Sequence, residues 1–200
     1  MYHHNGYLEI ILGTMFSGKT SYLLHKMSIM TELELKVLYI NINFDNRSNE
    51  VYSTHNPFLE NMDSKNKEKI SKFIKMVKVS KFSDIPIELI ETSDVIMIDE
   101  AQFFEGLYTF VNNLLEKNKN IFVGSLIANF KGEKFGEAID LIPICDNVVK
   151  LNSYCMECKK DKEYKHAVFS KKITLTEDLS NIDIGGSDKY IAVCRYHNKV

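Results

Sequence analysis

The segment that decides the fold reads Tyr7-Leu-Glu-Ile-Ile-Leu-Gly13-Thr-Met-Phe-Ser-Gly-Lys-Thr20. Its mostly apolar first part predicts a buried strand over residues 7–12. The stretch from Gly13 to Thr20 then satisfies the pattern G-x-x-x-x-G-K-[ST] of a phosphate-binding loop (P-loop). A helix is expected from Lys19 to about Met30, so the pattern stands between a strand and a helix. This context, which a P-loop requires, argues against a chance match of a short pattern.

All eight residues of this loop are therefore candidate ATP-binding residues. Its glycines allow the backbone to curl so that N–H groups converge on a phosphate, and the following helix N-terminus adds a favourable partial charge. We expect Lys19 to reach the β- and γ-phosphates and the Thr20 hydroxyl to bind Mg²⁺. The full set is Gly13, Thr14, Met15, Phe16, Ser17, Gly18, Lys19 and Thr20.

A second motif follows about 80 residues later, where an apolar strand over 94–98 runs into Asp99 and Glu100. Asp99 is expected to hold Mg²⁺, directly or through a water, which leaves Glu100 to act as a base on the incoming nucleophile. Acids are common at strand ends, but this pair follows a complete P-loop. Together the two motifs indicate nucleotide binding and phosphoryl transfer, and they do not identify the phosphate acceptor.

The remaining pattern predicts an α/β fold with a parallel sheet covered on both faces by helices. Apolar strands are expected over 36–42, 120–124 and 148–151, and helical spacing over 106–117. The polar stretch 46–69 predicts a long loop or partial disorder. Near residue 150 the composition changes to Cys, Lys, Asp and Gly, which predicts a nucleotide-binding domain over 1–150 and a small domain over 151–200.

Two pairs of potential metal ligands lie in this second domain: Cys155 with Cys158, and Cys194 with His197. Each C-x-x-[CH] pair is able to hold one side of a tetrahedral Zn²⁺, and a closed Cys₃His site suits a structural metal. A redox C-x-x-C pair, which lacks its usual βαβ setting here, and four unrelated residues are the alternatives. Cys145 is left over and is expected to be a buried core thiol.

Charge and hydropathy argue against several classes of partner. The chain has 25 basic and 27 acidic residues, a net charge of −2, so no overall field favours polymeric nucleic acid. A lysine-rich run over 159–172 predicts a solvated loop, with contact to an acidic partner as the alternative. No apolar stretch is long enough to span a bilayer and no secretory signal is recognised, so we expect a cytoplasmic protein without membrane contact.

These motifs, taken in order and spacing, resemble those of the zinc-containing (type II) thymidine kinase family over nearly the whole chain. The resemblance rests on the Met-Phe-Ser inside the P-loop and on the block Asp99-Glu-Ala-Gln-Phe-Phe104. It also rests on Tyr154-Cys-Met-Glu-Cys158 and on Ile184-Gly-Gly-Ser-Asp-Lys-Tyr-Ile-Ala-Val-Cys-Arg195. Their agreement together is more specific than any one motif.

The resemblance implies a RecA-like P-loop α/β domain followed by a small zinc domain whose lasso-shaped loop closes over deoxythymidine. It implies transfer of the ATP γ-phosphate to the nucleoside 5′-hydroxyl, giving dTMP and ADP, with Mg²⁺ and a structural Zn²⁺ as cofactors. Glu100 matches the catalytic base that takes the 5′-hydroxyl proton. A homotetramer and feedback inhibition by dTTP are also implied.

Further site residues follow from the resemblance, position by position. Phe130 falls where the family places an aromatic against the thymine ring, and Tyr190 matches a tyrosine near the nucleoside. Asp45 and Arg47 match an element at the phosphates, and Asp99 and Gln102 belong to the block assigned to the ATP site. The lasso segment that lines the nucleoside site comprises Asn181, Ile182, Asp183, Ile184 and Gly185. Taken alone, Gly185 and Gly186 predict only a turn.

Two positions depart from the family pattern. His197 replaces the more familiar last cysteine, which keeps four ligands. Ile127 stands where family members usually carry an Asp, which removes a polar group from that neighbourhood.

Two other functions are weighed against the kinase. A P-loop ATPase acting on nucleic acid or protein would use Glu100 to activate water, and it predicts ATP turnover without nucleoside. A nucleotide-sensing or scaffold protein built on a kinase fold predicts damage at Lys19, Thr20, Asp99 or Glu100, and all four are intact.

Overall fold

A computed structural model of the chain describes residues 6–43, 72–173 and 189–198. Its centre is a six-stranded sheet in the order β3-β2-β4-β5-β1-β6, and every neighbouring pair is parallel. The strands are β1 (Tyr7–Gly13), β2 (Val37–Ile42), β3 (Ile74–Val79), β4 (Val95–Ile98), β5 (Asn120–Leu126) and β6 (Asn147–Leu151).

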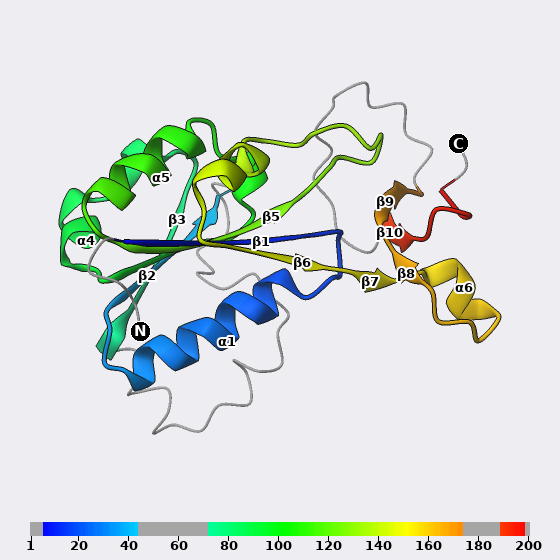
Figure 1. The fold of residues 1–200 in the computed structure, drawn as a ribbon, viewed down its shortest axis with the longest axis horizontal. Helices are drawn as coiled ribbons and strands as arrows, with labels where there is room; N and C mark the ends of the chain where they lie inside the picture. Colours follow the sequence, from blue (N-terminus) through cyan, green and yellow to red (C-terminus); the bar gives the residue numbers. More distant parts are fainter. Residues whose placement is uncertain (1–5, 44–71, 174–188, 199–200) are drawn as a thin grey trace.

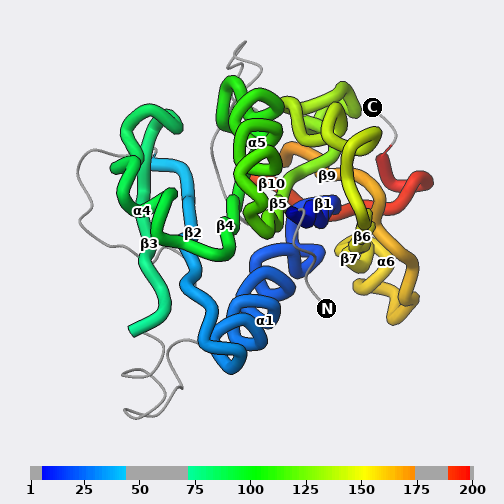
Figure 2. The backbone as a smooth tube through the Cα atoms, turned by 60° about the vertical axis from the view of Figure 1, so that its left-hand side comes forward, coloured from blue at the N-terminus to red at the C-terminus, as the bar shows by residue number. Residues whose placement is uncertain are grey.

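Helices cover both faces of this sheet (Figures 1 and 2). Helix α1 (Lys19–Glu32) lies on one face, and α4 (Ile87–Thr92) and α5 (Leu107–Glu116) lie on the other. Three short 3₁₀ segments join these elements: η1 (Phe82–Asp84), η2 (Ala101–Phe103) and η3 (Ala138–Ile144). The predicted α/β class, a parallel sheet flanked by helices, is confirmed.

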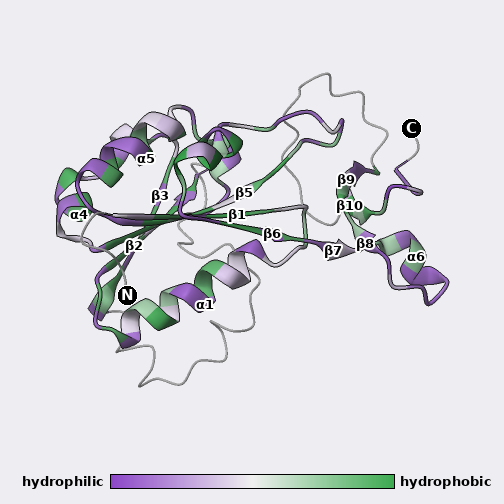
Figure 3. Ribbon diagram, in the orientation of Figure 1, coloured by the Kyte–Doolittle hydropathy of each residue, from purple (hydrophilic) through white to green (hydrophobic). Residues whose placement is uncertain are grey.

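The central strands are mostly apolar, as expected for a sheet that is covered on both faces. All four residues of β4 are buried, and the strands are mostly green in Figure 3. Residues that alternate along the strands contribute to two apolar layers. Leu8, Ile10 and Ile96 pack on the α5 side, whereas Ile11 and Met97 pack on the α1 side.

Parallel pairing brings the candidate site residues to one edge of the sheet. Gly13, the last residue of β1, pairs with Leu126 at the end of β5 and Leu151 at the end of β6. The P-loop, the acids after β4, the loop after β5 and the cysteines after β6 therefore all begin at the carboxyl ends of adjacent strands. Open α/β sheets bind ligands at this edge.

A smaller unit lies beyond these carboxyl ends (Figure 1). It comprises β7 (Ser153–Tyr154), α6 (Met156–Lys160), β8 (His166–Ala167), β9 (Phe169–Lys172) and β10 (Tyr190–Val193). The pairs β7–β8 and β9–β10 are antiparallel. We call β9 and β10 the C-terminal pair.

Most predicted elements are present, with ends shifted by one or two residues. Strand β3 and helix α4 were missed, and the short elements of the smaller unit were not predicted. Strand β3 lies at an edge of the sheet and carries Lys75 and Lys78, so its hydrophobic pattern is weak. The predicted loop over 46–69 lies outside the described residues, and the division between 150 and 151 stays a prediction. In the part of the chain that the structure describes, no helix is both long and apolar enough to cross a membrane.

Candidate active site and zinc site

The P-loop follows β1 in a tightly packed curve. A Cβ atom on Gly13 would lie 2.3 Å from Ser17 Oγ and 2.7 Å from the Leu151 carbonyl oxygen, so only glycine fits there. Gly18 precedes α1 with a φ of 88°, in the left-handed region that favours glycine. Within the described residues no side chain caps this end of α1. Helix N-termini attract anions through their backbone N–H groups, so this end suits a phosphate.

Inside the curve lie polar groups suited to phosphate oxygens. Lys19 is buried, and its Nζ donates to the Thr14 carbonyl oxygen at 2.9 Å. Burial lowers the Lys19 pKa, which the charges of Glu100 and Asp99 act to raise. Among the described residues, the buried hydroxyls of Thr14 and Ser17 have no hydrogen-bond partner. Buried polar atoms are normally satisfied, so these fit a loop that closes around an anion.

Asp99, at the end of β4, lies at the centre of a small network. Its Oδ2 accepts from Thr20 Oγ1 at 2.8 Å and from the Tyr39 hydroxyl at 2.7 Å, and its Oδ1 accepts from the Glu100 backbone N–H at 2.9 Å. Burial and the Asp99 charge raise the Tyr39 pKa well above its usual range, so Tyr39 stays a donor. The two predicted Mg²⁺ ligands, Thr20 and Asp99, are therefore in direct contact.

Glu100 has a left-handed backbone, with a φ of 52°, directly after the strand. Gln102 Nε2 donates to its Oε2 at 2.5 Å. Burial and the neighbouring Asp99 charge raise the Glu100 pKa, while Lys19 and the Gln102 hydrogen bond act to lower it. The carboxylate lies among the P-loop lysine and the Asp99 network, as a base near transferred phosphate requires.

The aromatic residues expected at the nucleoside are neighbours. Phe130, in the loop after β5, has its ring centroid 6.3 Å from that of Tyr190 at the start of β10. Lys172 Nζ, on β9, lies 5.6 Å from the Phe130 ring centroid. The structure thus brings the loop after β5 against the C-terminal pair.

Two residues of this region were not predicted from the sequence. The pattern around Tyr39 indicates only a strand, and no motif points to Ser170. Ser170 Oγ accepts from the backbone N–H of Met15 at 3.1 Å, which joins β9 to the P-loop. Ile127 packs against the apolar core on the α5 side, which explains an apolar residue there. Seven predicted site residues lie outside the described part: Asp45, Arg47, Asn181, Ile182, Asp183, Ile184 and Gly185.

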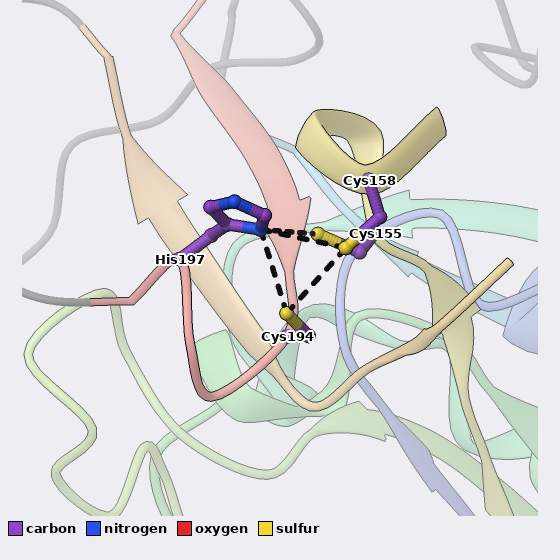
Figure 4. A group of neighbouring side chains, drawn as sticks. All are labelled: Cys155, Cys158, Cys194 and His197. Carbon is purple, nitrogen blue, oxygen red and sulfur yellow. Dashed lines mark hydrogen bonds between the residues drawn. The ribbon is translucent and has the colours of Figure 1, made fainter. Parts of the chain in front are cut away.

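The four predicted zinc ligands converge at the C-terminal pair (Figure 4). Cys155 precedes α6, Cys158 lies within it, and Cys194 and His197 follow β10. Cys145 is not part of this group: it is half-buried rather than fully buried, although it packs against the core as expected.

The spacing of these ligand atoms fits a tetrahedral zinc ion. His197 Nδ1 lies 3.5 Å from the Sγ of each of Cys155, Cys158 and Cys194, and two of the sulfurs, Cys158 and Cys194, are 3.8 Å apart. Tetrahedral Zn²⁺ with Zn–S of about 2.3 Å and Zn–N of about 2.0 Å requires about 3.5 Å between nitrogen and sulfur and about 3.8 Å between two sulfurs. These four contacts match the edges of such a coordination tetrahedron.

The acidity of the thiols supports the same conclusion. Burial acts to raise the pKa of Cys155, but hydrogen bonds from the backbone of Cys158 and Cys194 lower it to about 6. Burial raises the pKa of Cys158 to about 12, and the neighbouring thiols of Cys155 and Cys194 raise it as well. Ionisation of one thiol therefore opposes ionisation of the next, and a divalent cation would remove that penalty because metal-bound thiols are deprotonated.

Comparison with known proteins agrees with this arrangement. A model of the family described as "Thymidine kinase" matches residues 6–198. The chain belongs to the thymidine kinase family. The resemblance drawn from the motifs is confirmed. Because members of the thymidine kinase family are ATP-dependent kinases, the chain is an enzyme of that class.

Three similar members come from viruses and an animal. The thymidine kinase of sheeppox virus is 32% identical over 95% of each chain, and that of fowlpox virus is 34% identical over 96% of each. The bovine protein named "Thymidine kinase, cytosolic" is 31% identical over 95% of this chain and 71% of its own. Among solved structures, a DnaB-like replicative helicase has a TM-score of 0.47 and 10% sequence identity. The match covers 84% of this chain and 52% of the helicase chain, and a similarity at this level carries no functional argument.

Proposed function

We propose that this member of the thymidine kinase family transfers the γ-phosphate of ATP to the 5′-hydroxyl of deoxythymidine, giving dTMP and ADP. The observation that supports it most is one carboxylate, Glu100, placed beside the P-loop lysine and at the same sheet edge as the Phe130–Tyr190 pair. A phosphate donor and a nucleoside bound at these places would meet at Glu100.

The ATP phosphates would be held by the P-loop from Gly13 to Thr20. Converging N–H groups, the orphaned hydroxyls of Thr14 and Ser17, and the Lys19 ammonium supply donors for phosphate oxygens. We assign Asp45 and Arg47 to the phosphates on the resemblance alone. Positioning and charge balance carry most of the rate enhancement in phosphoryl transfer, so this loop serves both binding and catalysis.

Thr20 and Asp99 would hold Mg²⁺, because their oxygens touch at 2.8 Å and oxygen donors suit that ion. The ion supplies charge neutralisation on the phosphate oxygens when it is bound. Tyr39 keeps Asp99 in place by donating to the same carboxylate oxygen as Thr20.

Glu100 accepts the proton of the 5′-hydroxyl as that oxygen forms a bond to the γ-phosphorus. The bond between the γ-phosphorus and the bridging oxygen breaks at the same time, and ADP leaves with the electron pair. Phe130 would stack on the thymine ring and Tyr190 would lie beside the nucleoside. Residues 181–185 are assigned to the same site by resemblance.

Several properties of the whole protein belong to the same proposal. We assign the Cys₃His group a structural Zn²⁺, residues 1–150 a nucleotide-binding domain and residues 151–200 a zinc domain. A homotetramer and dTTP as feedback inhibitor follow from the resemblance. We also propose a cytoplasmic location, in keeping with the name of the bovine relative.

The decisive experiment measures ADP release by the purified protein with Mg-ATP, alone and with each nucleoside or with DNA. Turnover that appears only with a pyrimidine deoxynucleoside, deoxythymidine first, is expected. The Glu100→Gln variant should lose at least about a hundredfold in kcat while it still binds ATP, since general-base catalysis contributes that order. Turnover indifferent to nucleosides but stimulated by DNA or RNA would replace the kinase with the ATPase alternative.

A further inference from the structure

Gln102 occupies a buried position, 4% exposed, two residues after the proposed catalytic base. Its side-chain oxygen accepts from the Leu126 backbone N–H at 2.9 Å and from Ser125 Oγ at 3.2 Å. Its side-chain nitrogen donates to Glu100 Oε2 at 2.5 Å. The amide therefore joins the carboxylate to the end of β5.

The hydrogen-bonding partners fix the orientation of the Gln102 side-chain amide. The Leu126 backbone N–H is only a donor, so the side-chain oxygen of Gln102 must face it. The side-chain nitrogen then faces Glu100, whose ionised carboxylate is only an acceptor. Exchanging the two ends would place donor against donor and acceptor against acceptor.

The backbone of Gln102 packs against the loop that follows β5. A Cβ atom on Gly136 would lie 2.6 Å from both the Gln102 Cα and its carbonyl oxygen, so the returning arm of the loop after β5 presses against it. The next residue, Phe103, makes an edge-to-face contact with Phe135 at a centroid distance of 5.2 Å. The loop that carries Phe130 thus begins at Leu126, which is bonded to Gln102, and ends against the Gln102 backbone.

We propose that Gln102 is a positioning residue that fixes the Glu100 carboxylate toward the nucleoside hydroxyl and ties it to the loop carrying Phe130. With Oε2 accepting from the amide, Oε1 of Glu100 accepts no hydrogen bond within the described residues and is the oxygen left to take the proton. This role replaces the assignment of Gln102 to ATP binding, because its side-chain oxygen already accepts two hydrogen bonds and one of its two side-chain N–H groups bonds Glu100. The inference rests on the proposed role of Glu100.

A double-mutant cycle tests this role. Steady-state and single-turnover rates are measured for wild type, Gln102→Ala, Glu100→Ala and the double variant, with ATP and deoxythymidine each varied. Gln102→Ala should lower kcat about tenfold to a hundredfold, with both KM values changed less than about threefold. In the Glu100→Ala background the same substitution should cause no further loss, since a residue acting through Glu100 has nothing left to position.

Gln102→Glu separates positioning of Glu100 from support of β5. It keeps an acceptor for Leu126 and Ser125 but replaces the donor facing Glu100 by a carboxylate. We expect a kcat loss at least as large as that of Gln102→Ala. The rates are measured well below the urea unfolding midpoint of the variant, which the added buried carboxylate is expected to lower. A near-normal kcat in Gln102→Glu would overturn the inference and leave only a structural role.

The remaining outcomes distinguish the inference from the proposed function. If Gln102→Ala raises the KM for ATP by a larger factor than it lowers kcat, then Gln102 contacts ATP and does not act by positioning Glu100. A further loss in the double variant would also refute it. If Glu100→Ala keeps a near-normal rate, Glu100 is not the catalytic base. The proposed function is then wrong in that respect, and the inference about Gln102 is refuted with it.

Discussion

At the scale of single residues, Glu9 shows how a charge is kept inside this sheet. It lies in β1 with 1% of its surface exposed and accepts from the Tyr7 hydroxyl at 2.7 Å and the Tyr22 hydroxyl at 2.8 Å. Lys26 Nζ and Asn147 Nδ2 each lie 3.2 Å away. A buried carboxylate is tolerated only when it is paired and hydrogen-bonded, so this group joins α1, β1 and β6.

These contacts predict a pH-dependent stability. Burial acts to raise the Glu9 pKa, but hydrogen bonds from Tyr7, Tyr22, Asn147 and Lys26 outweigh it and leave the pKa below its usual value. A lowered pKa in the folded state contributes stability above the unfolded-state pKa of about 4.3, and that stability is lost as the pH falls through the folded-state pKa.

Glu9→Gln tests this contribution by urea unfolding at several pH values. At pH 7 the variant should be less stable by about 2 kcal/mol, because hydrogen bonds to a charged acceptor are lost. The difference from wild type should shrink between about pH 5 and pH 3. A difference that stays constant over this range would show that the Glu9 charge does not stabilise the fold.

At the scale of elements, the C-terminal pair is expected to depend on a metal held by the Cys₃His group. Among the described residues, the apolar cluster around it contains Cys155, Cys158 and Cys194, and its other buried members are Ala167, Ala192 and Val193. So few small side chains bury too little apolar surface to hold two short strand pairs, and small units of this kind usually need a metal. Tyr190 begins the strand that ends just before Cys194.

Cys194→Ser should therefore reduce zinc from about one ion per chain to near zero, raise the KM for deoxythymidine and expose the C-terminal pair to proteases. Zinc is measured by atomic absorption, and cleavage sites by mass spectrometry after limited proteolysis. Cys145→Ser is the matched control, because its thiol lies outside the metal group. Equal zinc content in the two variants would refute the metal assignment.

At the scale of the whole molecule, the sheet and the unit that contains the Cys₃His group meet at the P-loop. The Met15 N–H and Ser170 Oγ, 155 positions apart in the chain, are joined by a hydrogen bond of 3.1 Å. Phe130 and Tyr190 make a second connection between the same two parts. A structural change in either part is therefore expected to affect the other through these two contacts at the active-site edge of the sheet.

Ser170→Ala tests this connection. It removes the acceptor for the Met15 N–H, and an unmet backbone donor beside the loop should raise the KM for ATP about threefold to tenfold. Ser170→Thr keeps the hydroxyl and should stay closer to wild type. Steady-state kinetics with ATP varied give the answer, and an unchanged KM in Ser170→Ala would mean that the contact does not shape the loop.

The sequence by itself determined the α/β class, the P-loop, the acids after β4, the Cys₃His group and the family. These features are readable because each is a short motif whose chemistry fixes its residue types and spacing. The tertiary structure alone decided the strand order, the edge strand β3, the donation of Tyr39 to Asp99, the direction of the Gln102 amide and the contact of Ser170 with Met15. Such contacts join common residue types far apart in the chain, and only the packing of the sheet brings them within hydrogen-bonding distance.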